Sequence, residues 1–251
     1  MPDKSNTSTI NAATFKNAGN TSNNRYTDRS RAKRKFSLKD PGSAITHFIG
    51  MVMAVIAAPF LIIKAANVPG NVHVISMVIF ILSMICLYGA SATYHSLDLT
   101  TRTNRILRKI DHMMIFVLIA GSYTPVCLIV LGGSFGRFMF YLVWGIALAG
   151  ILIKACWITC PKWFSSVLYI GMGWVCILAF TQLLDKLSPA AFAWLLGGGI
   201  IYTVGGIIYA LKVPLFDLKH KNFGSHEIFH LFVMAGSICH YIFMYCYVVN
   251  M

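Results

Sequence analysis

Seven long apolar stretches, separated by short polar breaks, make up most of the chain from residue 44 onward. Each comes close to the about 20 residues that a helix needs to cross the hydrocarbon core of a bilayer. Pro, Gly, Asn and charged residues gather in the breaks, where helices end. The pattern predicts an all-α membrane protein, a seven-transmembrane helix bundle, with spans at about residues 44–66, 72–95, 110–131, 138–157, 164–184, 190–211 and 225–248.

Glycine and charge mark two of the predicted breaks and one of the spans. The stretch "SLDLTTRTNRILRK", residues 96–109, separates the second and third spans, and "GGSFGR", residues 132–137, separates the third and fourth. The sixth span contains "GGGIIYTVGG". Small residues let one membrane helix approach another closely, so we expect the sixth span to pack tightly against a neighbour.

The bulk composition supports the membrane assignment. Hydrophobic residues make up 57% of the chain, charged residues only 12%, and the mean hydropathy is +0.68. Soluble domains carry about 25% charged residues, so a soluble protein is excluded. The seven cysteines are odd in number and lie in or beside apolar stretches, which predicts buried free thiols and no disulfide framework.

The first 40 residues have a different composition. They are rich in Ser, Asn and Thr, and nine of the 21 Lys and Arg residues lie within the first 43 positions. They have no apolar signal-peptide core and too little apolar surface to offset the entropy of ordering. We expect residues 1–40 to form a disordered basic cytoplasmic tail before a seven-transmembrane domain at residues 41–251. A basic tail can bind nucleic acid, but beside a membrane span it is more typical of a flank attracted to anionic lipid, so no nucleic-acid partner is expected.

The Lys and Arg residues also predict an orientation. With the N-terminus in the cytoplasm, the tail and the connections on the same side hold 18 of them, and the opposite side holds only Lys64, Arg137 and Lys186. Cytoplasmic segments carry the excess of positive charge in membrane proteins. The N-terminus is therefore expected inside and the C-terminus outside.

The string His226-Glu227-Ile228-Phe229-His230 opens the last span and matches H-E-x-x-H. In soluble metalloproteases this string supplies two zinc ligands and a glutamate base. An intramembrane protease is one alternative, but no second motif that would supply its third ligand is visible. His240 lies further along the same span, near mid-membrane, and is not expected to bind the metal.

Polar residues from three spans share one depth at the cytoplasmic side. They are Ser91, His95, Asp111, His226 and His230. Ionisable groups in membrane spans are costly and mark functional sites, although a histidine at a span end can be merely interfacial. Asp111 has a second interpretation, as an ion-pair partner of Arg108 or Lys109. Three imidazoles and an acid around an open position match a catalytic zinc site.

Three segments that carry these residues resemble a known family. The segments "SATYHS", "KIDHMMIF" and "HEIFHLFVMAGSICH" are similar to the S-x-x-x-H, Asp and H-x-x-x-H motifs of the hemolysin III family, the bacterial branch of the progestin and adipoQ receptors, which include the adiponectin receptors. The segment "DPGSAITHFIG" looks like the family's opening motif with its acidic residue displaced or replaced, so no role is carried over to Asp40. The resemblance covers about residues 38–250.

This resemblance implies specific roles. It implies zinc bound by His95, His226 and His230, with Asp111 reaching the metal through water and Ser91 nearby. The adiponectin receptors resemble ceramidases in mechanism, so the resemblance implies a site that hydrolyses a lipid amide. It also implies a bacterial plasma-membrane protein, and the family name implies cytolysis.

Three functions follow as hypotheses. The first is a zinc-dependent hydrolase of a lipid amide or ester, in which Asp111 activates water and Ser91 stabilises the oxyanion. The second is a membrane-homeostasis sensor or receptor with structural zinc. The third is a cytolysin, although no polar stripe suited to a pore is visible. Membrane lipids are the expected partners, and the sequence predicts no particular protein partner.

The orientation is testable with reporter fusions. A reporter fused after residue 43 should report the cytoplasm, and one fused after Asn250 should report the outside, because the positive charges lie on the first side. Activity of both fusions on the same side would contradict an odd number of spans.

Overall fold

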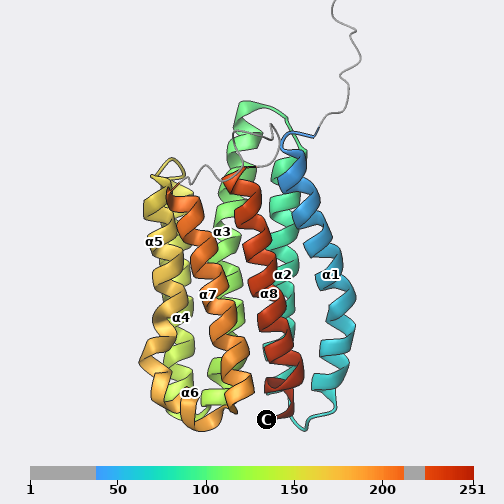
Figure 1. Cartoon of the computed structure of the whole chain (residues 1–251), viewed down its shortest axis with the longest axis vertical. Helices are drawn as coiled ribbons and strands as arrows, with labels where there is room; N and C mark the ends of the chain where they lie inside the picture. Colours follow the sequence, from blue (N-terminus) through green and yellow to red (C-terminus); the bar gives the residue numbers. More distant parts are fainter. Residues whose placement is uncertain (1–37, 212–223) are drawn as a thin grey trace, which may run out of the picture. The chain divides into compact units, whose positions relative to one another are not determined.

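The structure, a computed structural model, describes residues 38–211 and 224–251. In these ranges seven helical segments are long and apolar enough to cross a membrane, which confirms the predicted number of spans (Figure 1). The helices are α1 (Pro41–Ala66), α2 (Val72–Ser96), α3 (Thr101–Pro125) with η2 (Val126–Leu131), α4 (Gly133–Cys156), α5 (Lys162–Gly173) with η3 (Trp174–Ala179) and α6 (Phe180–Lys186), α7 (Pro189–Leu211), and α8 (Ser225–Cys246) with η4 (Val248–Asn250). The break predicted after the sixth span and residues 1–37 of the predicted tail lie outside the described residues.

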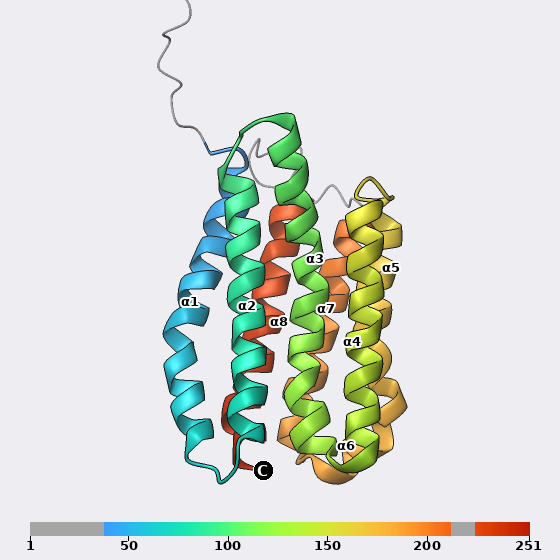
Figure 2. The ribbon, with the colours of Figure 1, turned by 180° about the vertical axis from the view of Figure 1, so that it is seen from behind.

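The helices lie side by side, and the last one returns to the first. The most extensive packing joins α1 to α2, α2 to α3 and α7 to α8, and α8 also packs on α1. Figure 2 shows the same bundle from behind, with α8 visible between the front helices. The start of α8 therefore lies at the same end of the bundle as the end of α2 and the start of α1.

α3 and α4 begin furthest ahead of the starts that the sequence predicted for their spans. α3 starts at Thr101, inside the predicted break, and the Thr100 hydroxyl caps it by accepting a hydrogen bond from the Thr103 N–H at 3.2 Å. The apolar pattern missed these turns because it marks where the chain crosses hydrocarbon, whereas a capped helix can continue into the polar zone. α4 starts at Gly133 because two consecutive glycines, Gly132 and Gly133, adopt φ values of +61° and +57° and reverse the chain in very few residues.

Two spans change helix type inside the membrane, which the sequence did not predict. The third span ends in the π-helical turn η2, directly after Pro125, and the fifth span is interrupted by the 3₁₀ segment η3. The Tyr123 hydroxyl bridges the second irregularity: it donates to the Gly173 carbonyl at 2.6 Å and accepts from the Cys176 N–H at 2.8 Å. A side chain of α3 thus satisfies backbone groups of a neighbouring broken helix.

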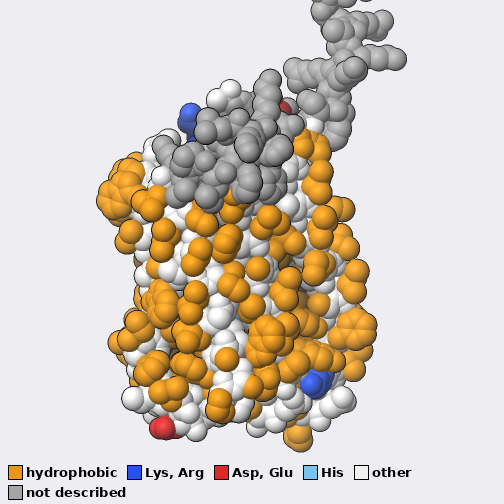
Figure 3. All heavy atoms as spheres, in the orientation of Figure 1, with side chains coloured by type: hydrophobic (Ala, Val, Ile, Leu, Met, Phe, Trp, Pro, Cys, Tyr) orange, Lys and Arg blue, Asp and Glu red, His pale blue; other side chains and the backbone are white. Residues whose placement is uncertain are grey.

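Apolar side chains cover both the interior and the outside of the bundle. The core contains fully buried residues such as Phe80, Tyr88 and Phe243. On the face shown in Figure 3, hydrophobic side chains extend over most of the height, and the visible charged side chains lie towards the two ends. Such an outer surface is expected where lipid is the solvent. All seven cysteines are free, as predicted, but the prediction that they are buried is wrong for most of them. Only Cys127 and Cys160 are buried, because the other thiols lie on outward-facing or terminal positions of the helices.

Glycines let α7 pack closely against α8, which confirms the expectation for the sixth span. A Cβ at Gly198 would lie 2.3 Å from the His240 ring, and one at Gly205 would lie 2.6 Å from Phe232. On the facing helix, a Cβ at Gly236 would lie 2.7 Å from the Tyr202 ring. The glycines therefore make room for rings of the opposite helix, two of which line the cavity described below.

Candidate metal centre

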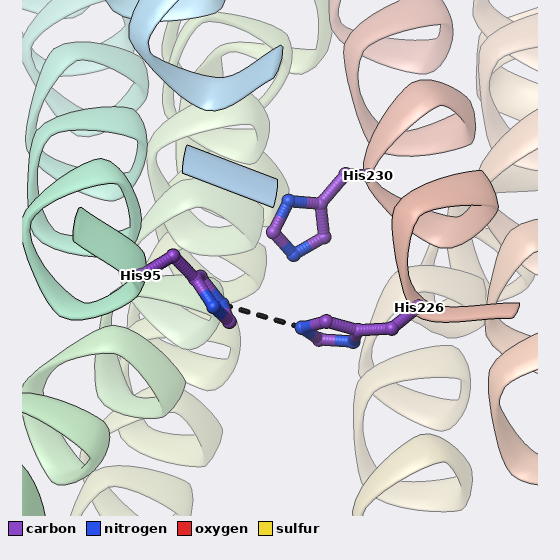
Figure 4. Close-up of side chains that lie close together, drawn as sticks. All are labelled: His95, His226 and His230. Atoms are coloured by element: carbon purple, nitrogen blue, oxygen red, sulfur yellow. Dashed lines mark hydrogen bonds between the residues drawn. The ribbon is translucent and has the colours of Figure 1, made fainter. Parts of the chain in front are cut away.

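Three histidines from two helices meet at one end of the bundle. His95 lies in the last turn of α2, and His226 and His230 lie one turn apart at the start of α8 (Figure 4). One ligand nitrogen from each lies within 4.8 Å of the others, and His95 Nε2 is 3.2 Å from His226 Nε2. His95 and His230 are only 3% and 2% exposed. The structure thus brings together the three predicted metal ligands in a cluster that can hold a metal ion.

The spacing of the cluster fits a transition metal. Two nitrogens bound to one tetrahedral zinc ion, each at about 2.0–2.1 Å, lie about 3.3 Å apart. The 3.2 Å between His95 Nε2 and His226 Nε2 is close to this value. Three imidazoles also form the ligand set of catalytic zinc sites, which leave a fourth position open. Imidazole suits zinc, copper, iron and nickel alike, so the donor set supports a metal site without identifying the metal.

Asp40 makes a contact that the sequence did not predict. It is the residue before α1, and its Oδ2 accepts a hydrogen bond from His95 Nδ1 at 2.9 Å. Its backbone N–H also donates to the His95 carbonyl at 2.9 Å. A carboxylate on the far nitrogen fixes the orientation and tautomer of a metal-binding imidazole. Asp40 therefore directs His95 Nε2 towards the cluster. The acid in the opening motif was the available signal, but its partner lies 55 residues away.

Glu227, the glutamate of the H-E-x-x-H string, has a structural contact at each carboxylate oxygen. Its Oε1 accepts from the Ser43 hydroxyl at 2.8 Å, and its Oε2 accepts from the Gly224 N–H at 2.8 Å. These bonds cap the N-terminus of α8 and tie it to α1. The geometry therefore favours a structural role for Glu227 and gives no support to the protease alternative.

Asp111 and Ser91 lie beside the cluster and are buried, with 7% and 1% of their surface exposed. The Asp111 carboxyl is close enough to interact electrostatically with His95 and His226, and it contacts Ser91. Among the described residues, Ser91 Oγ is buried and has no hydrogen-bond partner. Asp111 does not belong to the set of ligand atoms within 4.8 Å. This placement fits an acid that acts on a molecule at the metal and not on the metal directly.

The interpretation of Asp111 as an ion-pair partner of Arg108 or Lys109 is wrong for the described residues. The ion-pair partner of Asp111 is His112, with Oδ2 and Nδ1 3.3 Å apart. Lys109 turns away and donates a short hydrogen bond to the Ala155 carbonyl. Arg108 makes no ion pair with Asp111 in the structure described. Asp111 is therefore held in the interior by its own helix and not by the basic connection between the second and third spans.

His47 is a fourth histidine of the centre, which the sequence analysis missed. It lies on α1, 3% exposed, and its ring stacks on that of His230 with centroids 3.7 Å apart. In the described part of the chain neither of its ring nitrogens has a hydrogen-bond partner. A single histidine in an apolar helix carries no periodic signal, so only the fold reveals that His47 faces the ligands.

A cavity of about 210 Å³ extends from the centre into the bundle. Asp111, His226 and His230 line one part of it, and Tyr202 and His240 line a deeper part. His240 lies in the wall but outside the metal-binding cluster, as predicted. The rest of the wall is mainly apolar and includes Leu118, Phe192, Leu195 and Val233. The site therefore opens on a space suited to an apolar chain.

The sequence matches one family over most of its length. The family described as Haemolysin-III related matches residues 37–241. The chain belongs to the haemolysin-III-related family. The resemblance drawn from the motifs is thereby confirmed, and the motif histidines of this family member are the ones that cluster in the structure.

Relatives of this family member come from bacteria and eukaryotes. The Hemolysin-3 homolog of Bacillus subtilis (strain 168) is 39% identical over 214 residues, which cover 84% of this chain and 96% of that protein. Hemolysin-3 of Bacillus cereus is 34% identical over 84% of this chain and 92% of that protein. The Adiponectin receptor protein of Drosophila melanogaster is 26% identical over 80% of this chain and 49% of that protein.

The metal assignment predicts the behaviour of three histidine variants. His226→Ala and His230→Ala should each lose most of about one bound metal ion per chain, because two imidazoles are too few for a tight site. His240→Ala should keep the metal, since His240 lies about 15 Å beyond His230 along α8 at about 1.5 Å per residue. Metal analysis of the purified variants measures this. Full metal retention in both ligand variants would remove the assignment.

The contact of Asp40 predicts a graded loss of metal affinity. Asp40→Ala should fold and weaken metal binding by roughly 10- to 100-fold, because His95 then loses the group that orients its ring. Asp98→Ala is the matched control, since Asp98 is an exposed acid at the same end of the bundle and bonds to Asn104. Competition with a chelator measures both affinities. Equal affinities in the two variants would show that Asp40 does not support the site.

Proposed function

We propose that this protein is a zinc-dependent hydrolase of a lipid amide or ester. One observation carries the proposal: the clustered imidazoles of His95, His226 and His230 adjoin a mainly apolar cavity, and Asp111 and Ser91 lie in the same wall. This arrangement supplies a place for an acyl chain, a group that accepts a proton and a hydroxyl donor at one site. Membership of the haemolysin-III-related family, with relatives among the adiponectin receptors, supports it further.

The chemistry divides among a few side chains. His95, His226 and His230 would hold the zinc ion, which would supply Lewis acidity to polarise a carbonyl and make water more acidic. Asp111 takes a proton from the water that attacks the carbonyl carbon. It then returns that proton to the departing amine or alcohol, so that the carboxylate is restored. The Ser91 hydroxyl donates a hydrogen bond to the oxygen on which negative charge develops.

The remaining residues of the site position and shield these groups. Asp40 holds the ring of His95 through Nδ1 at 2.9 Å. The apolar walls around Leu118 and Phe192 take up the acyl chain and keep bulk water out. The substrate class is therefore a lipid whose amide or ester bond lies near one membrane surface while its chain extends towards mid-membrane.

The protein is a multi-pass membrane protein with bacterial homologues. We place it in the plasma membrane of a bacterial cell, with the metal centre at the cytoplasmic side. The division of 18 against 3 positive residues between the two sides supports this orientation. Substrate then enters from the membrane and not from solution.

A receptor or sensor with structural metal is the second candidate. The name of the Drosophila melanogaster relative, Adiponectin receptor protein, favours it, as does the fact that the histidines join α2 to α8. In that case the metal would fasten the two helices and Asp111 would have no chemical role. The names of the two Bacillus relatives refer to haemolysis, but the described residues offer no mechanism for cytolysis.

The variant Asp111→Asn separates the hydrolase from the structural site. Asparagine keeps the size of the side chain but cannot accept the proton. The variant should fold and keep its metal, yet lose activity by a factor of roughly 10² to 10⁴. The measurement is release of fatty acid from a ceramide-like substrate, together with metal content and melting temperature.

The control is Asp185→Asn, which changes an exposed aspartate at the other end of the bundle and should retain full activity. If the Asp111→Asn protein folds, keeps its metal and releases fatty acid as fast as the wild type, Asp111 is not the general base. If the wild type releases no fatty acid from any lipid tested, the receptor candidate takes its place.

A further inference from the structure

Lys154, near the end of α4, is a fully buried lysine without a carboxylate partner among the described residues. Its exposed fraction is 0%, and its Nζ donates to Cys160 Sγ at 3.0 Å and to Ser165 Oγ at 2.5 Å. Within residues 38–211 and 224–251 no Asp or Glu oxygen lies within ion-pair distance of it. A buried ammonium group without a counter-charge is costly. Of the two side chains to which its Nζ donates, Cys160 is the one with a thiol that can become an anion.

Cys160 lies in the short connection between α4 and α5, outside both spans. Its Sγ is 3.3 Å from Ser165 Oγ, so two polar groups face it. Burial raises the pKa of the Cys160 thiol, but the hydrogen bonds from Ser165 and Lys154 and the charge of Lys154 outweigh this effect. The pKa therefore lies below its ordinary value, and Arg108 on α3 lowers it further.

The other titratable groups near Cys160 do not compete for this role. Tyr169 on α5 and Tyr209 on α7 interact with it electrostatically, and both phenols are neutral near neutral pH. Cys156, one turn earlier at the same end of the bundle, is exposed and is not part of this cluster. The chain therefore carries an internal reference thiol four residues from the paired one.

We propose that Lys154 and Cys160 form a thiolate–ammonium pair, which makes Cys160 a site of reversible oxidation by small hydroperoxides. The thiolate sulfur attacks the terminal oxygen of the hydroperoxide, an S–O bond forms and the O–O bond breaks. Sulfur is oxidised to a sulfenic acid, and the hydroperoxide is reduced to an alcohol, or to water in the case of hydrogen peroxide. The Lys154 ammonium gives its proton to the departing oxyanion and becomes a neutral amine. Thiols reverse the modification.

The pair adjoins the cavity without belonging to the metal centre. Ser165, which contacts both Lys154 and Cys160, lines the cavity wall. Tyr169 also lines it, and its hydroxyl donates to the His112 carbonyl at 3.1 Å, next to Asp111. Oxidation removes the charges of both Cys160 and Lys154 and so changes the surroundings of Ser165 in the cavity wall. The proposal does not depend on whether the cavity holds a substrate.

The experiment compares two variants of the full-length protein that each keep one of the neighbouring thiols. Cys156→Ser leaves Cys160, and Cys160→Ser leaves Cys156. Each purified protein is treated with hydrogen peroxide between about pH 5 and pH 9 in the presence of a sulfenic-acid trap, and the labelled fraction at each position is measured by mass spectrometry. The midpoint of each pH profile reports the pKa of its thiol and not its accessibility.

We expect the Cys160 profile to have its midpoint about one pH unit or more below the Cys156 profile. Adding Lys154→Met, which removes the charge and leaves a buried apolar chain, should raise the Cys160 midpoint to or above that of Cys156. It should also lower labelling at pH 7 roughly tenfold, because one unit of pKa changes the thiolate fraction by about that factor.

Equal midpoints for Cys160 and Cys156, or no labelling of Cys160 at any pH, would overturn the proposal. So would a Lys154→Met protein that folds and leaves the Cys160 midpoint unchanged. If Lys154→Met does not fold, the comparison of the two single-serine variants decides alone, since both keep Lys154. An organic hydroperoxide in a parallel series sets the size limit of the oxidant.

Discussion

The hydrogen bond between Asp40 and His95 joins the start of α1 to the end of α2, and the geometry of the metal centre depends on it. α1 contributes no ligand of its own, yet it holds both ligand-bearing helices. Asp40, Ser43 and His47 follow one another at helical spacing, and they contact His95, Glu227 and His230 in turn. His95, Ser43, His47 and His230 are buried, whereas the Asp40 side chain is 42% exposed at the end of the bundle. The first helix thus acts as a brace that fixes the distance between α2 and α8.

The sequence predicts the parts of this fold that depend on composition and depth. Long apolar stretches identify the seven spans, and the positions of His95, His226 and His230 at one depth identify the cluster. The contacts of α1 with α2 and α8 could not be predicted in this way, because the partners of Asp40 and Ser43 lie 55 and 184 residues away in the sequence. The early starts of α3 and α4 could not be predicted either, since capping and positive φ angles do not alter hydropathy. The break at η3 is bridged by the Tyr123 hydroxyl from another helix, a tertiary contact that no local pattern reveals.

In this protein the H-E-x-x-H string differs in the role of its glutamate from the same string in soluble metalloproteases. Its two histidines face the cluster in this membrane helix, as they do in soluble metalloproteases. Its glutamate instead caps α8 and bonds to Ser43, where both carboxylate oxygens are occupied. The acid beside the cluster comes from another helix, at Asp111. Tertiary structure therefore decides which acid lies beside the cluster, and the motif taken alone would not reveal Asp111.

Tyr123 shows how a membrane helix can come to depend on a single oxygen atom of its neighbour. Its hydroxyl serves a carbonyl and an N–H of the broken fifth span, at Gly173 and Cys176. Each unsatisfied backbone group in hydrocarbon costs several kcal/mol. Exchange of tyrosine for phenylalanine, which is mild on most surfaces, would here remove the oxygen that both groups contact. In the described part of the chain it would leave the Gly173 carbonyl with only the Cys176 thiol, 3.7 Å away, as a side-chain donor. Tyrosine and phenylalanine have similar rings and would look interchangeable by size and hydrophobicity. At position 123 they are not, because the hydroxyl oxygen makes both backbone contacts.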